Sequence, residues 1–123
     1  MMKKLIQFEK ALNKLKDILN KEESEEIRDA TIKRFEFTFE LCWKSLQEFF
    51  KEKGIICRSP KDCFKQAFSY GLIENEDIWI NIIQDRNLTT HTYQEELAKE
   101  IYFKIKEYVY HFEKLLINMK KNL

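Results

Sequence analysis

The sequence predicts an all-helical fold, and three observations lead to that prediction. The chain of 123 residues contains only two glycines and one proline, so it has few of the signals that hairpins and tight turns need. Its apolar residues recur at steps of three and four along stretches without a helix breaker. Charged residues make up 35% of the chain, which suits the exposed faces of long helices. We therefore expect an antiparallel four-helix-bundle core with one additional short helix, in a single domain over residues 1–123.

Apolar spacing and capping residues predict the first two helices. One helix face in the first segment is formed by Leu5, Phe8, Leu12, Leu15 and Leu19. Ser24 is a suitable N-cap for a second helix, which we expect to span residues 25–53 and to end at Gly54. Phe37 and Leu41 lie roughly 140–180° from the centre of its main apolar stripe. A helix that is apolar on two sides usually has two partners, so this second side predicts a homodimer.

Further capping signals predict three more helices. The run Ser59-Pro60-Lys61-Asp62 is typical of a helix start, and Gly71 is expected to end that short helix. Asn75 is a suitable N-cap for a second short helix. Thr92 and Glu95 resemble a capping box for the last long helix. The apolar face of that helix repeats at steps of four and three: Ile101, Ile105, Tyr108, Phe112, Leu115 and Met119.

The charge balance excludes one class of function. The chain carries 22 Lys and Arg residues against 21 Asp and Glu residues, a net charge of +1. This argues against a strongly basic module that binds duplexes mainly by counterion release, so any nucleic-acid site must be a local patch. No stretch approaches the roughly 20 apolar residues that a membrane span needs, and we expect no membrane association.

The cysteines and the N-terminal segment predict a cytoplasmic protein. The cysteines are an odd number with no Cys-x-x-Cys pair: Cys42, Cys57 and Cys63. We therefore expect reduced thiols rather than a disulfide framework or a zinc knuckle. Gln7, Glu9 and Lys10 interrupt any apolar run near the N-terminus, so we expect no signal peptide.

The sequence contains no sign of a metal or a cofactor, and we expect neither. His111 has no second His or Cys at metal-ligand spacing, so a packed or surface histidine is the simpler interpretation. Glu36, Glu40 and Lys44 lie at i,i+4 spacing on one helix face. That spacing is more typical of a solvated ion-pair ladder than of paired catalytic acids.

The segment from Arg86 to Tyr93 combines three chemically active side chains. Arg86 keeps its charge and can bind a phosphate with two hydrogen bonds, and His91 can exchange a proton near neutral pH. These two groups are the minimum needed to cut a phosphodiester without a metal. Tyr93 adds a hydroxyl that is a candidate modification target. The residues alone leave a second interpretation open, namely a helix C-terminus with ordinary polar surface.

Helix geometry separates Arg86 from His91. Five positions in an unbroken helix place them about 140° apart, so they would not face the same ligand. Either the helix breaks near Thr89 and Thr90, or two copies meet in a dimer and the arginine of one serves the histidine of the other. If the turn stays helical, Asn87 lies four residues before His91 and is placed to orient the imidazole.

The same segment resembles a known family. It matches the Arg-x4-His-x-Tyr signature of HEPN-domain proteins, in the branch that partners minimal nucleotidyltransferases. The rest of the chain is similar to the proteins called nucleotidyltransferase substrate-binding. The similar pieces are residues 35–44, residues 59–62, and Trp79 ahead of Asp85-Arg86-Asn87.

The resemblance implies a four-helix-bundle homodimer with the motif at its interface and a separately encoded minimal nucleotidyltransferase as partner. In toxin members of the family, arginine and histidine act in metal-independent RNA cleavage. By position these roles fall on Arg86 and His91, with Asn87 as the supporting polar residue and RNA as substrate. Tyr93 matches the tyrosine that the partner adenylylates to silence the toxin.

Two functions follow as expectations. The first is the RNase toxin of a toxin-antitoxin pair, and the second is a non-catalytic subunit that docks the nucleotidyltransferase or holds its substrate. The chain itself is not expected to be a nucleotidyltransferase, because it has no Asp-x-Asp pair for magnesium and no Gly-Ser turn for phosphates.

Overall fold

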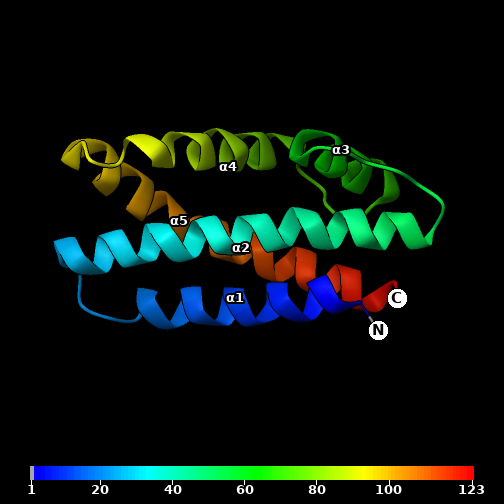
Figure 1. Cartoon of the computed structure of the whole chain (residues 1–123), viewed down its shortest axis with the longest axis horizontal. Coiled ribbons are helices and arrows are strands. Elements are labelled where there is room, and N and C mark those ends of the chain that lie inside the picture. The colour runs from blue at the N-terminus through cyan, green and yellow to red at the C-terminus, as the bar shows by residue number, and fades with distance from the viewer. Residues whose placement is uncertain (1) are drawn as a thin grey trace.

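The computed structural model describes residues 2–123, and all regular secondary structure in that range is helical. The elements are α1 (Lys3–Leu19), α2 (Glu25–Glu52), α3 (Pro60–Tyr70), α4 (Glu76–Leu88), the 3-10 turn η1 (Thr89–His91) and α5 (Glu95–Lys121). Figure 1 shows α2 between α1 on one side and α3 and α4 on the other, with α5 behind and the two termini at one end. The expected all-helical bundle is confirmed. No helix in the described range is long and apolar enough to cross a bilayer.

Most helix ends follow the residues that the sequence offers for capping. The Ser24 hydroxyl accepts a hydrogen bond from the Ile27 amide at 3.1 Å, and the Ser59 hydroxyl accepts one from the Asp62 amide at 3.2 Å. The Asn75 side chain caps α4 in the same way. Gly54 and Gly71 have φ angles of 78° and 93°, the left-handed conformation that ends α2 and α3 with least strain. These predicted ends are confirmed.

The predicted capping box of the last helix is wrong. Helix α5 begins at Glu95 after Gln94, which makes no side-chain cap. The Thr92 hydroxyl instead donates to the carbonyl of Thr89 at 2.9 Å. The Thr92 hydroxyl therefore stabilises the preceding 3-10 turn instead of capping α5.

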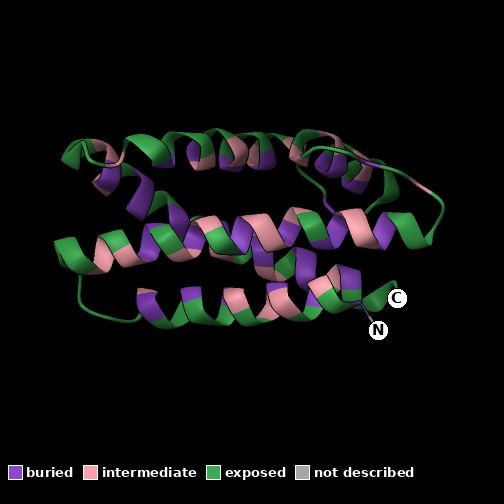
Figure 2. Ribbon diagram, in the orientation of Figure 1, coloured by how far each residue is buried: buried purple, intermediate pink, exposed green. Residues whose placement is uncertain are grey.

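Aromatic side chains join the helices into one core. The ring of Phe112 on α5 lies 6.1 Å from Phe8 of α1, 6.3 Å from Phe35 of α2 and 5.5 Å from Trp79 of α4. Trp79 also stacks on Phe64 of α3 at 4.6 Å. Figure 2 shows the buried faces of the helices turned towards one another. Because Phe112 contacts three other helices, it fixes the positions of α1, α2 and α4 together.

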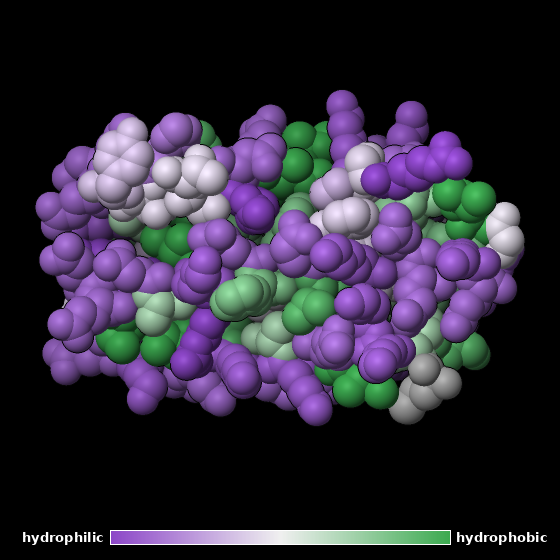
Figure 3. Space-filling view, viewed as in Figure 1, coloured by the Kyte–Doolittle hydropathy of each residue, from purple (hydrophilic) through white to green (hydrophobic). Residues whose placement is uncertain are grey.

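The second apolar side of α2 faces outwards, as expected. Phe37 is 56% exposed, while Leu41 is partly buried against the core. Together with Ala11 they line a shallow groove of about 280 Å³ between α1 and α2. Figure 3 shows hydrophobic side chains gathered at the middle of this face. The homodimer that this side predicts stays a prediction.

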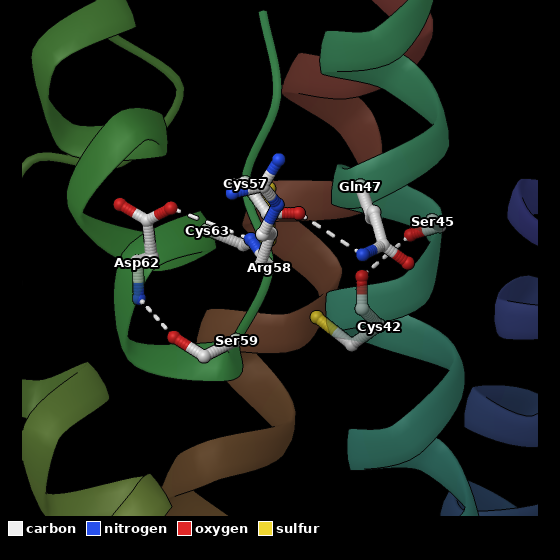
Figure 4. The surroundings of a disulfide bond; sticks show 8 residues. All are labelled: Cys42, Ser45, Gln47, Cys57, Arg58, Ser59, Asp62 and Cys63. Atoms are coloured by element: carbon white, nitrogen blue, oxygen red, sulfur yellow. Dashed lines mark hydrogen bonds between the residues drawn. A yellow bond between two sulfur atoms is a disulfide. The ribbon is translucent and has the colours of Figure 1, made fainter.

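The expectation of three reduced cysteines is wrong for two of them. Cys57 and Cys63 form a disulfide with their Cα atoms 5.1 Å apart (Figure 4). Ser59 and Pro60 start α3 immediately after an extended segment, so the first turn of α3 brings Cys63 beside Cys57. Cys42 is free and buried, and its burial raises the pKa of the thiol. The cytoplasmic location was expected partly because the thiols were expected to be reduced. With Cys57 and Cys63 in a disulfide, that reason no longer holds.

Candidate functional site

The backbone of the motif segment is held by its own threonines. Helix α4 ends at Leu88, and the chain tightens into η1, so the helix breaks near Thr89 and Thr90, as the first of the two alternatives requires. Each threonine hydroxyl donates to the carbonyl three residues earlier: Thr89 to Arg86 (2.6 Å), Thr90 to Asn87 (3.2 Å) and Thr92 to Thr89 (2.9 Å). These bonds satisfy carbonyls that a helix end leaves without intrahelical partners.

Arg86 lies in the last turn of α4 and reaches across to α2. Its Nη2 atom is 3.9 Å from Oε1 of Glu40, and its side chain is 26% exposed. Its Nε atom is buried and makes no hydrogen bond. An ion pair at this distance and exposure contributes little, so the guanidinium keeps donors for a stronger acceptor such as a phosphate.

Glu40 is a site residue that the sequence reasoning missed. Its Oε2 atom lies 3.7 Å from Nζ of Lys44, as the predicted ladder requires, but its other oxygen faces Arg86. Glu40 and Arg86 are 46 positions apart, and no periodicity within one helix links them. The ladder prediction is therefore incomplete, because Glu40 also partly neutralises the candidate arginine.

Asp85 anchors the end of α4 from the inside. It is buried, it accepts a hydrogen bond from the Tyr108 hydroxyl, and Nζ of Lys104 lies 3.6 Å away. Burial, with the bond to Asp85 second, raises the pKa of Tyr108 well above its usual value. Adjacent helix residues point about 100° apart, so fixing Asp85 on α5 turns Arg86 towards α2.

The sequence does contain a signal that Asp85 is buried. Asp85 lies three residues after the buried Ile82 and six after the buried Trp79, so helix periodicity puts it on the face towards the core. A lone acid on such a face needs a buried partner. The identity of that partner, Tyr108, is set by the packing of α4 on α5.

His91 and Tyr93 lie beyond the end of α4, on the outside of the connection. Both side chains are exposed, Tyr93 to 78%, and their rings meet edge to face with centroids 6.1 Å apart. Tyr93 also lines a cavity of about 310 Å³ that carries the acids Glu25, Asp29 and Glu95. The imidazole and the phenol are thus both accessible to another molecule.

Within one chain, Arg86 and His91 have different neighbours. Arg86 faces Glu40 of α2, whereas His91 lies against Tyr93, and among residues 2–123 no hydrogen bond or ion pair joins Arg86 to His91. Asn87 is exposed, and the condition for it to lie one α-helical turn before His91 is not met, because α4 ends between them. Within one chain, Arg86 is therefore turned towards α2, while His91 and Tyr93 lie on the outside of the connection.

The other histidine, His111, lies on α5 and is partly buried. Burial lowers the pKa of His111, with smaller effects from Glu107, which raises it, and Lys114, which lowers it. In the part of the chain that the structure describes, no three His, Cys, Asp or Glu side chains are grouped to hold a metal ion.

The chain is similar to proteins of a known family. A family model described as nucleotidyltransferase substrate binding protein like matches residues 3–121. A Haemophilus influenzae protein named probable ribonuclease HepT is 30% identical over 95 residues, which are 73% of this chain and 65% of that protein. The chain thus spans 65% of the length of this curated relative.

Two solved structures share the fold. A crystal structure of a Thermus thermophilus protein has a TM-score of 0.86 and 38% identity, with 91% of this chain and 98% of that chain covered. A Haemophilus influenzae structure, described as the fold of a substrate-binding domain of a nucleotidyltransferase, has a TM-score of 0.79 and 25% identity, with 94% and 98% covered. These matches confirm the resemblance drawn from the sequence.

Proposed function

The chain belongs to the nucleotidyltransferase substrate-binding protein-like family, and from that premise we propose that it is the RNase toxin partner of a minimal nucleotidyltransferase. One observation carries the proposal. At the end of α4, an arginine with only a weak ion pair and an unpaired Nε atom is followed five residues later by an exposed histidine. These are the groups that metal-independent phosphodiester cleavage needs, and the relative named as a probable ribonuclease agrees with that chemistry.

The proposed reaction is an internal transfer at phosphorus. His91 takes the proton of a ribose 2′-hydroxyl, and the resulting oxygen attacks the adjacent phosphorus. The bond from phosphorus to the 5′-oxygen breaks, and a second imidazole returns a proton to that oxygen. Arg86 stabilises the negative charge on the phosphate oxygens, where charge-assisted hydrogen bonds are strongest. The products are a 2′,3′-cyclic phosphate and a free 5′-hydroxyl.

The separate neighbours of Arg86 and His91 favour a site made by two copies. In a homodimer, Arg86 of one copy can serve His91 of the other, and the second imidazole comes from the same pair. The exposed Phe37 lies one helix turn before Glu40, the residue that Arg86 faces. Burying Phe37 and Leu41 between two copies would supply apolar area on α2 near Glu40.

Tyr93 is the proposed regulatory site, because its ring is among the exposed large side chains and lies beside His91. Its hydroxyl attacks the α-phosphorus of ATP in the partner enzyme, and pyrophosphate leaves. The adenylate adds bulk and negative charge next to the imidazole and repels the phosphates of RNA. Mass spectrometry after incubation with the partner and ATP should show adenylate on Tyr93, and label elsewhere alone contradicts the assignment.

The activity is tested by incubating RNA with the purified protein in excess chelator. His91→Ala is expected to lose about 10²–10⁴-fold in rate, the usual contribution of one proton-transfer group, and Arg86→Ala about 10²–10³-fold, the usual contribution of one group that stabilises charge in the transition state. His111→Gln changes the other histidine and is expected to cleave like the unchanged protein. Equal cleavage by the unchanged protein and His91→Ala, or cleavage by neither, would overturn the proposal.

The second candidate function is a non-catalytic subunit that docks the nucleotidyltransferase or holds its substrate. The similarity to the Haemophilus influenzae fold described as a substrate-binding domain of a nucleotidyltransferase favours it. Expression in cells separates the two functions. The RNase predicts growth arrest that the partner gene relieves, whereas the docking subunit predicts normal growth with either gene alone.

A further inference from the structure

A second cavity lies on the same side of α2 as Glu40, at the C-terminal half of that helix. Its volume is about 540 Å³, and it is bounded by α2, by the segment between α2 and α3, and by the start of α1. Four basic side chains and one acid line it: Lys4, Lys44, Lys51, Arg58 and Glu48. By contrast, the cavity beside Tyr93 carries three acids and one arginine.

The positive charges of this basic cavity are largely uncompensated. In the described part of the chain, Lys4, Lys51 and Arg58 take part in no ion pair within 4 Å. The single acid, Glu48, accepts a hydrogen bond from the backbone amide of Lys4 at 3.3 Å. Several like charges on concave walls create a strong local potential, which favours a ligand with more than one negative charge.

The wall that carries Arg58 is fixed before any ligand binds. The disulfide ties Cys57 to Cys63 of α3, and Nε2 of Gln47 donates to the Cys57 carbonyl at 3.0 Å. Asp62 accepts from the backbone amide of Arg58 at 3.4 Å, so the arginine side chain is not needed for that bond. Figure 4 shows these contacts between α2, the connecting segment and α3. A preformed wall lowers the entropy that binding would otherwise cost.

The basic cavity is connected to the candidate site by a chain of charged contacts. Arg86 lies 3.9 Å from Glu40, Glu40 lies 3.7 Å from Lys44, and Lys44 lines the cavity. At 1.5 Å per residue, Glu40 and Lys51 are separated by roughly 16 Å along α2, a span of a few nucleotides. A strand with one phosphate at Arg86 would therefore bring later phosphates over the cavity.

We propose that this basic cavity is a phosphate-binding subsite for a single strand of RNA whose reacting phosphate lies at Arg86. The choice of RNA rests on the proposed function, while the choice of phosphate rests on the charges and the fixed walls. Lys51 and Arg58 bind the backbone, and the exposed Ile56 provides an apolar surface at the same wall. Free nucleotides offer the same phosphate chemistry and are separated from RNA by the experiment.

The experiment measures binding of a fluorescent 2′-O-methyl RNA 12-mer by anisotropy between 50 and 200 mM salt. This probe has no free 2′-hydroxyl at its internal linkages, so binding is measured whether or not the protein cleaves RNA. The double variant Lys51→Ala/Arg58→Ala is expected to lower the slope of log K against log salt by about 1.4, since each single-strand phosphate contact contributes about 0.7. At 0.1 M salt this corresponds to roughly 25-fold weaker binding.

The matched control is Lys61→Ala/Lys65→Ala, which removes the same charge from exposed positions on the neighbouring α3. It is expected to bind the 12-mer nearly as well as the unchanged protein. Equal weakening by both double variants, or no binding by the unchanged protein, overturns the subsite. Displacement of the 12-mer by ATP at equal phosphate concentration overturns the assignment to RNA.

Failure of the subsite and failure of the proposed function give different results. Binding that depends on Lys51 and Arg58 without any RNA cleavage supports the subsite and contradicts the RNase. Cleavage that depends on His91, with binding that is indifferent to Lys51 and Arg58, supports the RNase and contradicts the subsite.

Discussion

The connection from α2 to α3 and the connection from α4 to α5 lie at opposite ends of the molecule and are held by different forces (Figure 1). The first is tied by the Cys57–Cys63 disulfide and by Gln47, a side chain of the helix behind it. The second is held by threonine hydroxyls that bond only to carbonyls three residues away. Because threonines hold this connection, the side chains of His91 and Tyr93 are not needed for its hydrogen bonds, and both are exposed.

The support beneath the two connections also differs. The end of α4 is fixed from the core by Asp85 and Tyr108, whereas the segment that follows α2 is tied to α3 by a covalent bond. The proposed chemistry at the α4–α5 end therefore depends on one buried polar contact, whereas the basic cavity at the α2–α3 end depends on a crosslink. Four predictions test it, in order of decreasing effect.

Tyr108→Phe should have the largest effect on stability. It removes the hydroxyl that donates to Asp85 and leaves a buried carboxylate with only Lys104 nearby. Hydrogen bonds to charged groups contribute about 1.5–3 kcal/mol, so we expect a loss of about 2–3 kcal/mol in the free energy of unfolding at pH 7, measured by urea denaturation. Tyr110→Phe, at an exposed position on the same helix, should change stability by less than about 0.5 kcal/mol.

Alkaline pH gives a second readout for Tyr108. Because its pKa is raised in the native state, the unfolded chain releases this proton near pH 10 while the native protein keeps it. The unfolded state then binds fewer protons, so native stability falls as pH rises above about 10. The fall should be smaller in Tyr108→Phe, and an unchanged slope would show that Tyr108 is not the group responsible.

Reducing the disulfide should have the next largest effect. Cys57 and Cys63 are six positions apart, and a crosslink that closes so short a loop stabilises by about 2 kcal/mol in the chain-entropy treatment. Cys57→Ser/Cys63→Ser is expected to lose about that much, and a reducing agent should lower the unfolding midpoint of the unchanged protein alone. Arg86 and His91 at the α4–α5 end are untouched, whereas the wall of the basic cavity that carries Arg58 loses its crosslink, so RNA binding there should weaken. An unfolding midpoint of the unchanged protein that stays the same in reducing agent would contradict a stabilising disulfide.

Thr89→Val should have a smaller and more local effect. The substitution keeps the shape of a buried side chain but removes its hydrogen bond to the Arg86 carbonyl, which we expect to cost about 1 kcal/mol. Amide hydrogen exchange should speed up over residues 89–94 and stay unchanged around Cys57. Thr90→Val, at an exposed position, is the control and should cost only a few tenths of a kcal/mol. Equal effects of both variants would remove the special role of Thr89.

His111→Gln should have the smallest effect, at the third connection, between α3 and α4. His111 lines a small cavity there with Leu72 and Asn75, and burial lowers its pKa. In the unfolded chain, the His111 imidazole binds a proton near pH 6.5, whereas in the native protein it does so only at lower pH. The free energy of unfolding therefore decreases as pH falls below 6.5. The variant should show a shallower loss between pH 6.5 and 5, and an equal loss would assign it to other groups.

Short-range sequence was enough to set the helices and most of their ends. Ser24, Ser59 and Asn75 cap helices through bonds to amides two or three residues away, and Gly54 and Gly71 end helices through their own φ angles. Such contacts depend on residues within one turn, so a pattern of letters contains them. The break after Leu88 belongs to the same class, because neighbouring threonine hydroxyls stabilise it.

Which groups the motif faces was set by the packing of the helices. Glu40 meets Arg86 and Asp85 meets Tyr108 across separations of 46 and 23 positions, and these partners depend on how α4 packs against α2 and α5. The predicted capping box at Thr92 is absent because the Thr92 hydroxyl had two possible partners, the start of α5 and the preceding turn. It bonds to the Thr89 carbonyl of that turn. A hydrogen bond within one helix turn depends only on neighbouring residues in the chain. A contact between two helices forms only where the burial of their apolar faces has already brought the helices together.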